Sequence, residues 1–308
     1  MTTLRLGLVG LGKIARDQHL PAIAVNPNFE LVATASRNAC AEGVASYPDL
    51  STMLAAEPTL DAVILCQPPQ VRFAVAREAL LAGKHVFLEK PPGATLSEVE
   101  ALIGLSRERG VTLFASWHSR YAAAVAPTRA FLAQARIKSV RIDWKEDVRV
   151  WHPGQKWIWQ PGGFGVFDPG INALSILTGI LPEPVRCTQA TLHVPTNCHV
   201  PIAAELAMLT SSGVPIAAAF NFLQQGPQSW DICIETDRGP VLLSEGGNKL
   251  SLDGVIQPVT AEHEYTALYV RFADLIGQGA SDVDLAPLRL VADAFMVGEI
   301  RPTEPFVE

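Results

Sequence analysis

The feature that most constrains the fold of this chain is a glycine motif directly after a short apolar run near its start. Residues 4–9 (LRLGLV) predict a buried strand, and residues 10–15 (GLGKIA) match the G-x-G-x-x-G/A pattern of a dinucleotide-binding βαβ unit. Gly10 would make the tight turn, Gly12 would let the backbone approach a pyrophosphate, and Ala15 would let the helix pack closely on the strand. The helix N-terminus would offer N–H groups to the phosphates, so a nucleotide site is favoured over an ordinary glycine turn.

The next strand, residues 31–35, ends where the ribose would be recognised. An NAD-specific site usually carries Asp or Glu there, but this chain has Ser36-Arg37-Asn38. Arg37 can pair with a 2′-phosphate or stack on adenine, and Ser36 and Asn38 can donate hydrogen bonds to the same phosphate. We therefore expect NADP as cofactor, with NAD also accepted. The alternative is that Arg37 is a solvated turn residue.

Composition narrows the class of protein. The 308 residues suggest about two domains, and 48% hydrophobic content is sufficient for two cores. A net charge of −7 without a basic run argues against nucleic-acid binding, and no apolar run is long enough to predict a membrane span. The cysteines form no C-x-x-C pair and no spacing suggests a metal site, so we expect reduced thiols, no metal and a cytoplasmic protein. The cysteines are Cys40, Cys66, Cys187, Cys198 and Cys233.

Strand and helix patterns alternate through the first third of the chain. The expected strands are residues 62–66, 85–89 and 112–116, and the expected helices are residues 70–82 and 96–108. This alternation predicts an α/β fold with an N-terminal Rossmann domain, residues 1–119, built on a doubly wound parallel sheet. Ligands of such sheets gather at the carboxyl ends of the strands. Two segments lie there, residues 66–70 (CQPPQ) and 89–92 (EKPP).

From about residue 120 the pattern changes. We expect an α+β domain at residues 120–308 with a large, mainly antiparallel open sheet, which would bind substrate and mediate oligomerisation. The expected strands are residues 140–145, 185–193, 202–210, 215–222, 230–236, 241–244 and 249–252, and the expected helices are residues 122–133, 169–177, 265–276 and 285–297. Because one face of such a sheet is commonly buried between subunits, we expect a homodimer or a higher homo-oligomer.

Five short motifs occur in the order found in one oxidoreductase family. They are residues 10–15, Pro68-Pro69, Glu89-Lys90-Pro91, Gly162-Gly163, and residues 168–172 (DPGIN). Through these motifs and their order, the chain resembles the glucose–fructose oxidoreductase/inositol dehydrogenase/rhizopine-catabolism (Gfo/Idh/MocA) family. The resemblance covers essentially the whole chain. Four further stretches resemble the bacterial D-galactose and L-arabinose 1-dehydrogenases within this family. They are residues 14–21 (IARDQHLP), 117–120 (WHSR), 144–148 (WKEDV) and 151–155 (WHPGQ).

Lys90 is the residue on which the chemistry is expected to depend. The resemblance implies that it lies between the nicotinamide and the reacting carbinol, and Pro91 would fix its turn, in the trans or the cis form. Oxidation of a C1 hydroxyl needs a proton acceptor on oxygen while hydride leaves carbon. An ammonium gives up its proton reluctantly near neutrality, but the positive charge of oxidised nicotinamide and partial burial both favour the neutral amine.

Asp168 and Asn172 are four residues apart and would share one face of a helix that begins near Pro169. The resemblance implies that Asp168 binds the sugar or takes part in proton transfer; an N-cap role for Asp168 is the alternative. Many family members carry a histidine where this chain has Asn172. Asparagine cannot carry a proton, so proton transfer would rest on Lys90 and Asp168, and Asn172 would hydrogen-bond substrate or cofactor.

The remaining expected ligand contacts divide into two groups. A pyranose would pack on Trp151 and be hydrogen-bonded by the polar side chains of its pocket. The expected substrate-binding residues are Lys90, His118, Glu146, Trp151, His152, Asp168 and Asn172. The expected cofactor-binding residues are Gly10, Gly12, Lys13, Ile14, Ser36, Arg37, Asn38, Gln67, Pro68, Glu89, Lys90 and Asn172.

These expectations together favour an NAD(P)-dependent aldose 1-dehydrogenase. It would oxidise the C1 hydroxyl of D-galactose, L-arabinose or D-fucose to the lactone by hydride transfer to the nicotinamide. Two alternatives stay open: a non-catalytic, cofactor-binding sugar sensor or regulator on the same fold, and a dehydrogenase of the family that acts on another sugar or cyclitol. A regulator would be expected to lose Lys90 or the acid of the cleft, and the chain has both.

Overall fold

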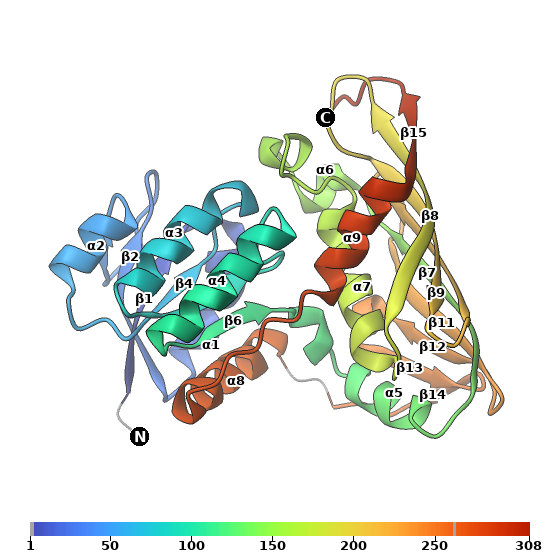
Figure 1. Ribbon diagram of the computed structural model, residues 1–308, viewed down its shortest axis with the longest axis horizontal. Coiled ribbons are helices and arrows are strands. Elements are labelled where there is room, and N and C mark those ends of the chain that lie inside the picture. Colours follow the sequence, from blue (N-terminus) through green and yellow to red (C-terminus); the bar gives the residue numbers. More distant parts are fainter. Residues whose placement is uncertain (1–2, 261–262) are drawn as a thin grey trace. The chain divides into compact units, whose positions relative to one another are not determined.

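The chain is organised as two compact units (Figure 1). The computed structural model describes residues 3–260 and 263–308. The first unit contains the described residues up to His118 together with His263–Asp284, and the second contains residues 119–260 and Leu285–Glu308. The expected division into residues 1–119 and 120–308 therefore needs a correction, because a segment near the end of the chain returns to the first unit.

A six-stranded parallel sheet forms the centre of the first unit. Its strand order is β3-β2-β1-β4-β5-β6, which is the Rossmann arrangement that the alternating pattern predicts. The strands are β1 (Leu4–Val9), β2 (Phe29–Ala35), β3 (Ala45–Tyr47), β4 (Ala62–Leu65), β5 (His85–Glu89) and β6 (Leu113–Ser116). The helices between them are α1 (Leu20–Ala24), α2 (Leu50–Ala56), α3 (Pro69–Leu81) and α4 (Leu96–Arg109). Sequence analysis missed β3 and α2, which are short.

Local sequence signals account for the ends of the helices. A capping box starts α4, in which the Thr95 side chain accepts from the Glu98 N–H and Glu98 returns a bond to the Thr95 N–H. Gly110 ends α4 in the left-handed region, at φ 65°. The first helix is less regular than its glycine motif suggests, because residues 15–19 form a π-helical turn ahead of α1.

The returning segment contains α8 (Glu264–Gln278), which packs against the first unit through aromatic rings. Tyr269 stacks on Phe87 with ring centroids 5.4 Å apart, and Phe272 lies 5.5 Å from Phe87 and 6.0 Å from Phe114. Contacts between rings remote in sequence leave no local signal, so the boundary predicted from the change in strand and helix pattern missed them. Burial of these rings fixes α8 beside α1 (Figure 1).

The second unit is built on a nine-stranded sheet in the order β14-β13-β12-β11-β7-β10-β9-β8-β15. It is mainly antiparallel, as expected, but β10 pairs parallel with β7 and β15 pairs parallel with β8. The strands are β7 (Ile137–Lys145), β8 (Val185–Pro195), β9 (Ala203–Thr210), β10 (Pro215–Asn221), β11 (Ser229–Thr236), β12 (Val241–Ser244), β13 (Lys249–Leu252), β14 (Val255–Gln257) and β15 (Gly298–Thr303). Sequence analysis did not predict β14 and β15, the two edge strands.

Helices cover one face of this sheet. They are α5 (Val125–Leu132), α7 (Phe167–Ile180) and α9 (Ala286–Val297), with the short α6 (Val148–Trp151) nearby in sequence. Figure 1 shows α7 and α9 on the same side of the strands, in contact with each other. A Cβ at Gly170 of α7 would lie 2.9 Å from a ring carbon of Phe220, so α7 approaches β10 at the distance that only glycine permits. Within the described residues, no helix is long and apolar enough to cross a membrane.

Replacement of Gly170 by alanine tests this close packing. Because the buried Phe220 ring must move, we expect Gly170→Ala to lower the free energy of unfolding by about 1–3 kcal/mol in urea titrations. The matched control is Gly104→Ala in α4, where a Cβ would meet nothing within 4 Å. That change should be neutral or stabilise by up to about 1 kcal/mol. Equal effects of the two changes would contradict the packing argument.

Candidate active site

In the first unit, most of the expected cofactor residues lie where the parallel strands end. Those after β1, β2, β4 and β5 therefore share one edge of the sheet. They are Gly10, Gly12, Lys13, Ile14, Ser36, Arg37, Asn38, Gln67, Pro68, Glu89 and Lys90, and Asn172 belongs to the second unit. This edge is our candidate dinucleotide site.

Two glycines shape the turn after β1. Gly10 has φ +93°, and a Cβ there would lie 2.9 Å from the backbone nitrogen of Gln67. At Gly12 a Cβ would meet nothing within 4 Å, so the turn leaves open space in front of the helix N-terminus. Ala15 is fully buried, as the close packing of helix and strand predicts. Lys13 is exposed and forms an ion pair with Asp17 one turn later.

The ribose-recognition segment follows β2 directly. Ser36 donates its backbone N–H to the carbonyl oxygen of Tyr47 at 2.9 Å, which fixes the chain as it leaves the sheet. Arg37 and Asn38 are exposed and carry their polar groups into solvent at the sheet edge. The segment can therefore present a guanidinium and hydrogen-bond donors to an anionic group.

Two loops after β4 and β5 carry the groups expected to face the nicotinamide. The Gln67 side-chain oxygen is buried and has no hydrogen-bond partner within the described residues, so it is available to a donor on a bound ligand. Lys90 follows β5, is partly buried, and is joined to Pro91 by a cis peptide bond. His118 lies beyond β6, where its Nδ1 is 2.6 Å from a carboxylate oxygen of Glu264.

A buried ion pair lies directly behind Lys90. His19 Nε2 is 3.0 Å from Oε1 of Glu89, and the Tyr265 hydroxyl donates to the same oxygen at 2.8 Å. Burial alone would lower the pKa of His19, but the neighbouring Cys66 and Glu89 side chains outweigh burial and raise it to about 10. Burial would likewise raise the pKa of Glu89, yet the hydrogen bonds from His19 and Tyr265 and the histidine charge lower it to about 2. Both groups are therefore charged near neutrality.

In the second unit, three of the expected substrate residues form one polar cluster. His152 Nε2 is 3.2 Å from Oε1 of Glu146, and His152 Nδ1 is 3.7 Å from Oδ2 of Asp168. Both carboxylates are buried, with 3% of Glu146 and 4% of Asp168 exposed. A neutral imidazole can donate to one of the two carboxylates and a protonated ring to both, so the cluster can bind hydroxyl groups and hold a proton.

The structure corrects the cap alternative for Asp168. Helix α7 begins at Phe167 after an N-cap at Val166, so Asp168 is the second residue of the helix. A carboxylate in the first turn is still favoured by the helix dipole, without serving as the cap. Asn172 follows one turn later and is partly buried, while Asp168 is buried.

Sequence analysis missed one residue of this cluster. Trp230 donates its indole N–H to Oε2 of Glu146 at 2.8 Å, and its ring lies edge-on to Trp151 with centroids 4.9 Å apart. Trp151 keeps 40% of its surface exposed, which leaves an aromatic face free for a ligand. Trp230 lies within the apolar alternation of β11, so only the pairing of β11 with β7 reveals its role.

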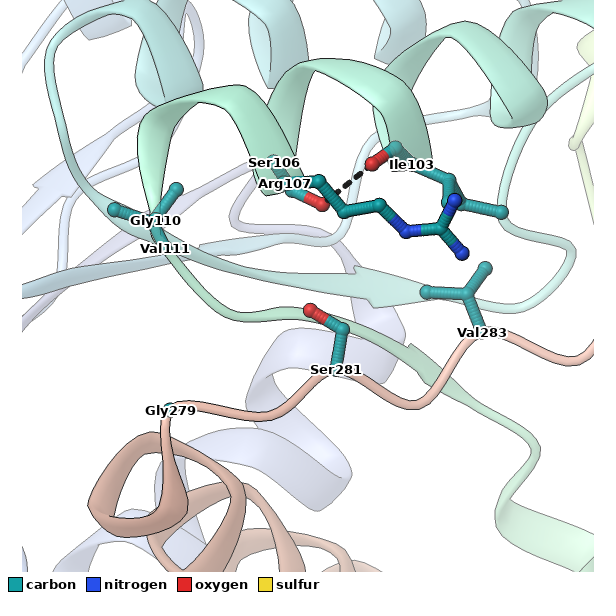
Figure 2. A pocket seen from close by; sticks show the side chains of 8 residues that line it. All are labelled: Ile103, Ser106, Arg107, Gly110, Val111, Gly279, Ser281 and Val283. Carbon is teal, nitrogen blue, oxygen red and sulfur yellow. Dashed lines mark hydrogen bonds between the residues drawn. The ribbon is translucent and has the colours of Figure 1, made fainter.

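Figure 2 shows a pocket elsewhere in the first unit. Its volume is about 450 Å³. It is lined by Ile103, Ser106, Arg107, Gly110, Val111, Gly279, Ser281 and Val283. Its hydroxyl groups are used internally, because Ser106 donates to the carbonyl of Ile103 and Ser281 accepts from the N–H of Leu113. Among these described residues, Arg107 has the one charged side chain in the lining, and none of them is an expected site residue. Across residues 3–260 and 263–308, no cluster of three or more His, Cys, Asp or Glu is placed to hold a metal ion.

Comparison with known proteins agrees with the class that this fold and strand edge define, an oxidoreductase with a dinucleotide-binding Rossmann unit. Residues 4–116 match the Gfo/Idh/MocA sequence family, described as an oxidoreductase family with an NAD-binding Rossmann fold. Galactose 1-dehydrogenase of Pseudomonas fluorescens is 49% identical over 308 residues, which covers 100% of both chains. The chain belongs to the Gfo/Idh/MocA family of oxidoreductases, so the resemblance of its motifs is confirmed.

Solved structures extend the similarity to the whole fold. The crystal structure of a D-galactose-1-dehydrogenase protein from Rhizobium etli has a TM-score of 0.95 and 59% identity, covering 100% of this chain and 99% of that one. KijD10, a 3-ketoreductase from Actinomadura kijaniata in complex with TDP-benzene and NADP, has a TM-score of 0.83 over 98% of this chain and 100% of its own. At 19% identity, this second likeness shows the fold alone.

The buried ion pair predicts a pH dependence of stability. The pKa of His19 is raised from 6.5 to about 10, so its contribution is complete below pH 6.5 and is lost as the pH rises toward 10. Glu89, lowered from 4.5 to about 2, contributes above pH 4.5 and loses this as the pH falls toward 2. We expect His19→Gln to lower the melting temperature most between pH 4.5 and pH 6.5, where both contributions are complete. The difference in melting temperature from the wild type should shrink as the pH rises above 6.5. Exposed His199→Gln is the control, and a deficit constant from pH 6 to 10 would contradict the ion pair.

Proposed function

We propose that this oxidoreductase is an aldose 1-dehydrogenase that prefers NADP and oxidises the C1 hydroxyl of D-galactose, L-arabinose or D-fucose to the lactone. The observation that carries the proposal is full-length similarity to two proteins named as galactose 1-dehydrogenases. The Glu146–His152–Asp168 cluster supports it, because a sugar ring needs several buried hydrogen-bonding groups.

In the proposed reaction the C1–H and O–H bonds break while a C=O bond forms. Bound oxidised nicotinamide supplies the hydride acceptor. Lys90 takes the hydroxyl proton on its Nζ, since general-base assistance is needed as hydride leaves carbon. Asp168 binds the reacting sugar, and its Oδ2 lies 3.7 Å from Nδ1 of His152.

The three candidate sugars suit one pocket. They share their configuration around most of the ring and differ mainly at the C5 substituent. In the proposed complex Trp151 packs on an apolar face of the ring, while Glu146 and His152 hydrogen-bond hydroxyl groups. Asn172 contributes an amide that holds sugar or cofactor without carrying a proton.

The cofactor assignment rests on the chain's own residues. Gly10 and Gly12 would hold the pyrophosphate, and the open space at Gly12 fits this role. Ser36, Arg37 and Asn38 would bind the 2′-phosphate. The buried, unpartnered oxygen of Gln67 fits a donor on the nicotinamide side of the cofactor.

A substrate panel tests the proposal directly. D-galactose, L-arabinose, D-fucose, D-glucose and myo-inositol would each be supplied with NADP⁺ or NAD⁺, and the absorbance of the reduced nicotinamide followed. We expect turnover with the first three sugars and a higher kcat/KM with NADP⁺. Activity confined to inositol would indicate a cyclitol dehydrogenase. Tight cofactor binding without turnover of any substrate would indicate a sensor and overturn the proposal.

Arg37 is expected to determine cofactor preference. If its guanidinium pairs with the 2′-phosphate, Arg37→Ala should lower kcat/KM for NADP⁺ by a factor that corresponds to roughly 1.5–3 kcal/mol. The kcat/KM for NAD⁺ should change much less. The kinetics with NAD⁺ are the internal control, because the fold and the sugar site are the same in both assays. Equal losses with both cofactors would mean that Arg37 only stacks on adenine.

Asp168 is expected to act in the reaction, because its buried carboxylate lies beside His152 and does not cap α7. Asp168→Asn removes a buried carboxylate beside His152, so we expect a lower melting temperature together with a reduction of kcat by about 10²-fold or more, as expected when a group that transfers protons is lost. Asn172→Ala should mainly raise KM. The control is Asp274→Asn on the exposed side of α8. Near-wild-type kinetics of Asp168→Asn would remove Asp168 from the catalytic site.

A further inference from the structure

Arg72 is a buried arginine at the start of α3. Only 2% of its surface is exposed. It is the fourth residue of α3, at the positive end of the helix dipole, where a cation is disfavoured. Removing a guanidinium from water also costs several kcal/mol unless its donors are satisfied. The position therefore has to be explained by what the guanidinium binds.

The guanidinium binds the backbone of two loops that are separate in sequence. Nη1 donates to the carbonyl oxygens of Glu89 and Pro91, and Nη2 donates to the carbonyl oxygen of Gln67. The first two carbonyls flank Lys90, and the third belongs to the loop after β4 that is assigned to the nicotinamide. One rigid planar group thus sets the separation of the two loops, which a lysine ammonium, as a single point charge, cannot reproduce.

The Glu89 carboxylate holds the same segment from the other side. Its Oε2 accepts the backbone N–H of Lys90 at 2.9 Å, while Oε1 accepts from His19 and Tyr265. The His19 ring is fixed in turn by the Tyr269 hydroxyl, 2.8 Å from Nδ1. The N–H of Lys90 and the carbonyls on both sides of it are therefore held by buried charged groups, which restricts the direction in which its side chain leaves the sheet.

We propose that Arg72 is a positioning residue that sets where the Lys90 amine stands relative to the cofactor loop, by holding the carbonyl oxygens of Gln67, Glu89 and Pro91. This inference rests on the proposed function of Lys90 as the proton acceptor. A displacement of about 1 Å at a reacting group can cost about 10²-fold in rate. Arg72 thus acts on the reaction through Lys90, without touching the sugar.

The first test compares two arginines of one helix. Arg72→Lys keeps the charge and loses the fork, whereas Arg77→Lys changes an exposed residue of α3. With D-galactose and NADP⁺ we expect kcat of Arg72→Lys to fall about 10–100-fold while the Kd for NADP⁺ stays within about threefold. The kinetic isotope effect with C1-deuterated galactose should rise toward its limiting value, because hydride transfer becomes rate-limiting. Arg77→Lys should behave as the wild type.

A double-mutant cycle then separates positioning from general structural damage. Lys90→Ala should lose about 10²–10⁴-fold in kcat, and adding Arg72→Lys to it should cost no more than about twofold further. If the two losses multiply, or if Arg72→Lys keeps wild-type kcat, the proposal is wrong. If circular dichroism shows that Arg72→Lys does not fold, Arg72→Gln takes its place in the cycle. A wild-type enzyme that oxidises no aldose would instead overturn the proposed function itself.

Discussion

The parallel pairing of β1 with β2 and β4 is the constraint on which the candidate site depends. Because every strand of the first sheet runs in the same direction, the segments after β1, β2, β4 and β5 all leave at one edge. The glycine turn, the Ser36–Asn38 segment, Gln67 and Lys90 thereby come from distant parts of the sequence to one place. Helices cover the faces of β4, β5 and β6, which is why these strands are largely buried and mostly apolar.

The buried ionisable side chains have different partners in the two units. In the first, Arg72 and Glu89 are buried and bind the backbone on either side of Lys90, and His19 binds the Glu89 carboxylate, so these charged groups hold the loop after β5. In the second, the carboxylates of Glu146 and Asp168 lie beside the two ring nitrogens of His152. Such an arrangement places the hydrogen-bonding groups of the second unit around His152, although position 172 is asparagine.

Helix α8 follows most of the second unit in sequence but packs in the first unit. Tyr265 and Tyr269 of α8 reach Glu89 and His19, so the hydrogen bonds behind Lys90 are completed by residues more than 170 positions later in the chain. The same helix buries Phe272 against Phe87 and Phe114, which fixes it by apolar contact. The stability of α8 and the placement of the β5 loop are consequently coupled.

Much of the fold could be read from the sequence by itself, because hydrophobic periodicity and glycine geometry are local. The run of residues 4–15 determined the first strand and turn, and the alternation that followed predicted four more strands of the first sheet. The motifs were also sufficient to expect Lys90 and Asp168 in a catalytic role. Tertiary structure decided what depends on distant contacts: the membership of α8, the edge strands β14 and β15, the non-cap position of Asp168, and the hydrogen bonds of Trp230 and Arg72. Such residues look like ordinary members of a helix or strand until folding brings their partners within hydrogen-bond distance, and that distance is what defines their function.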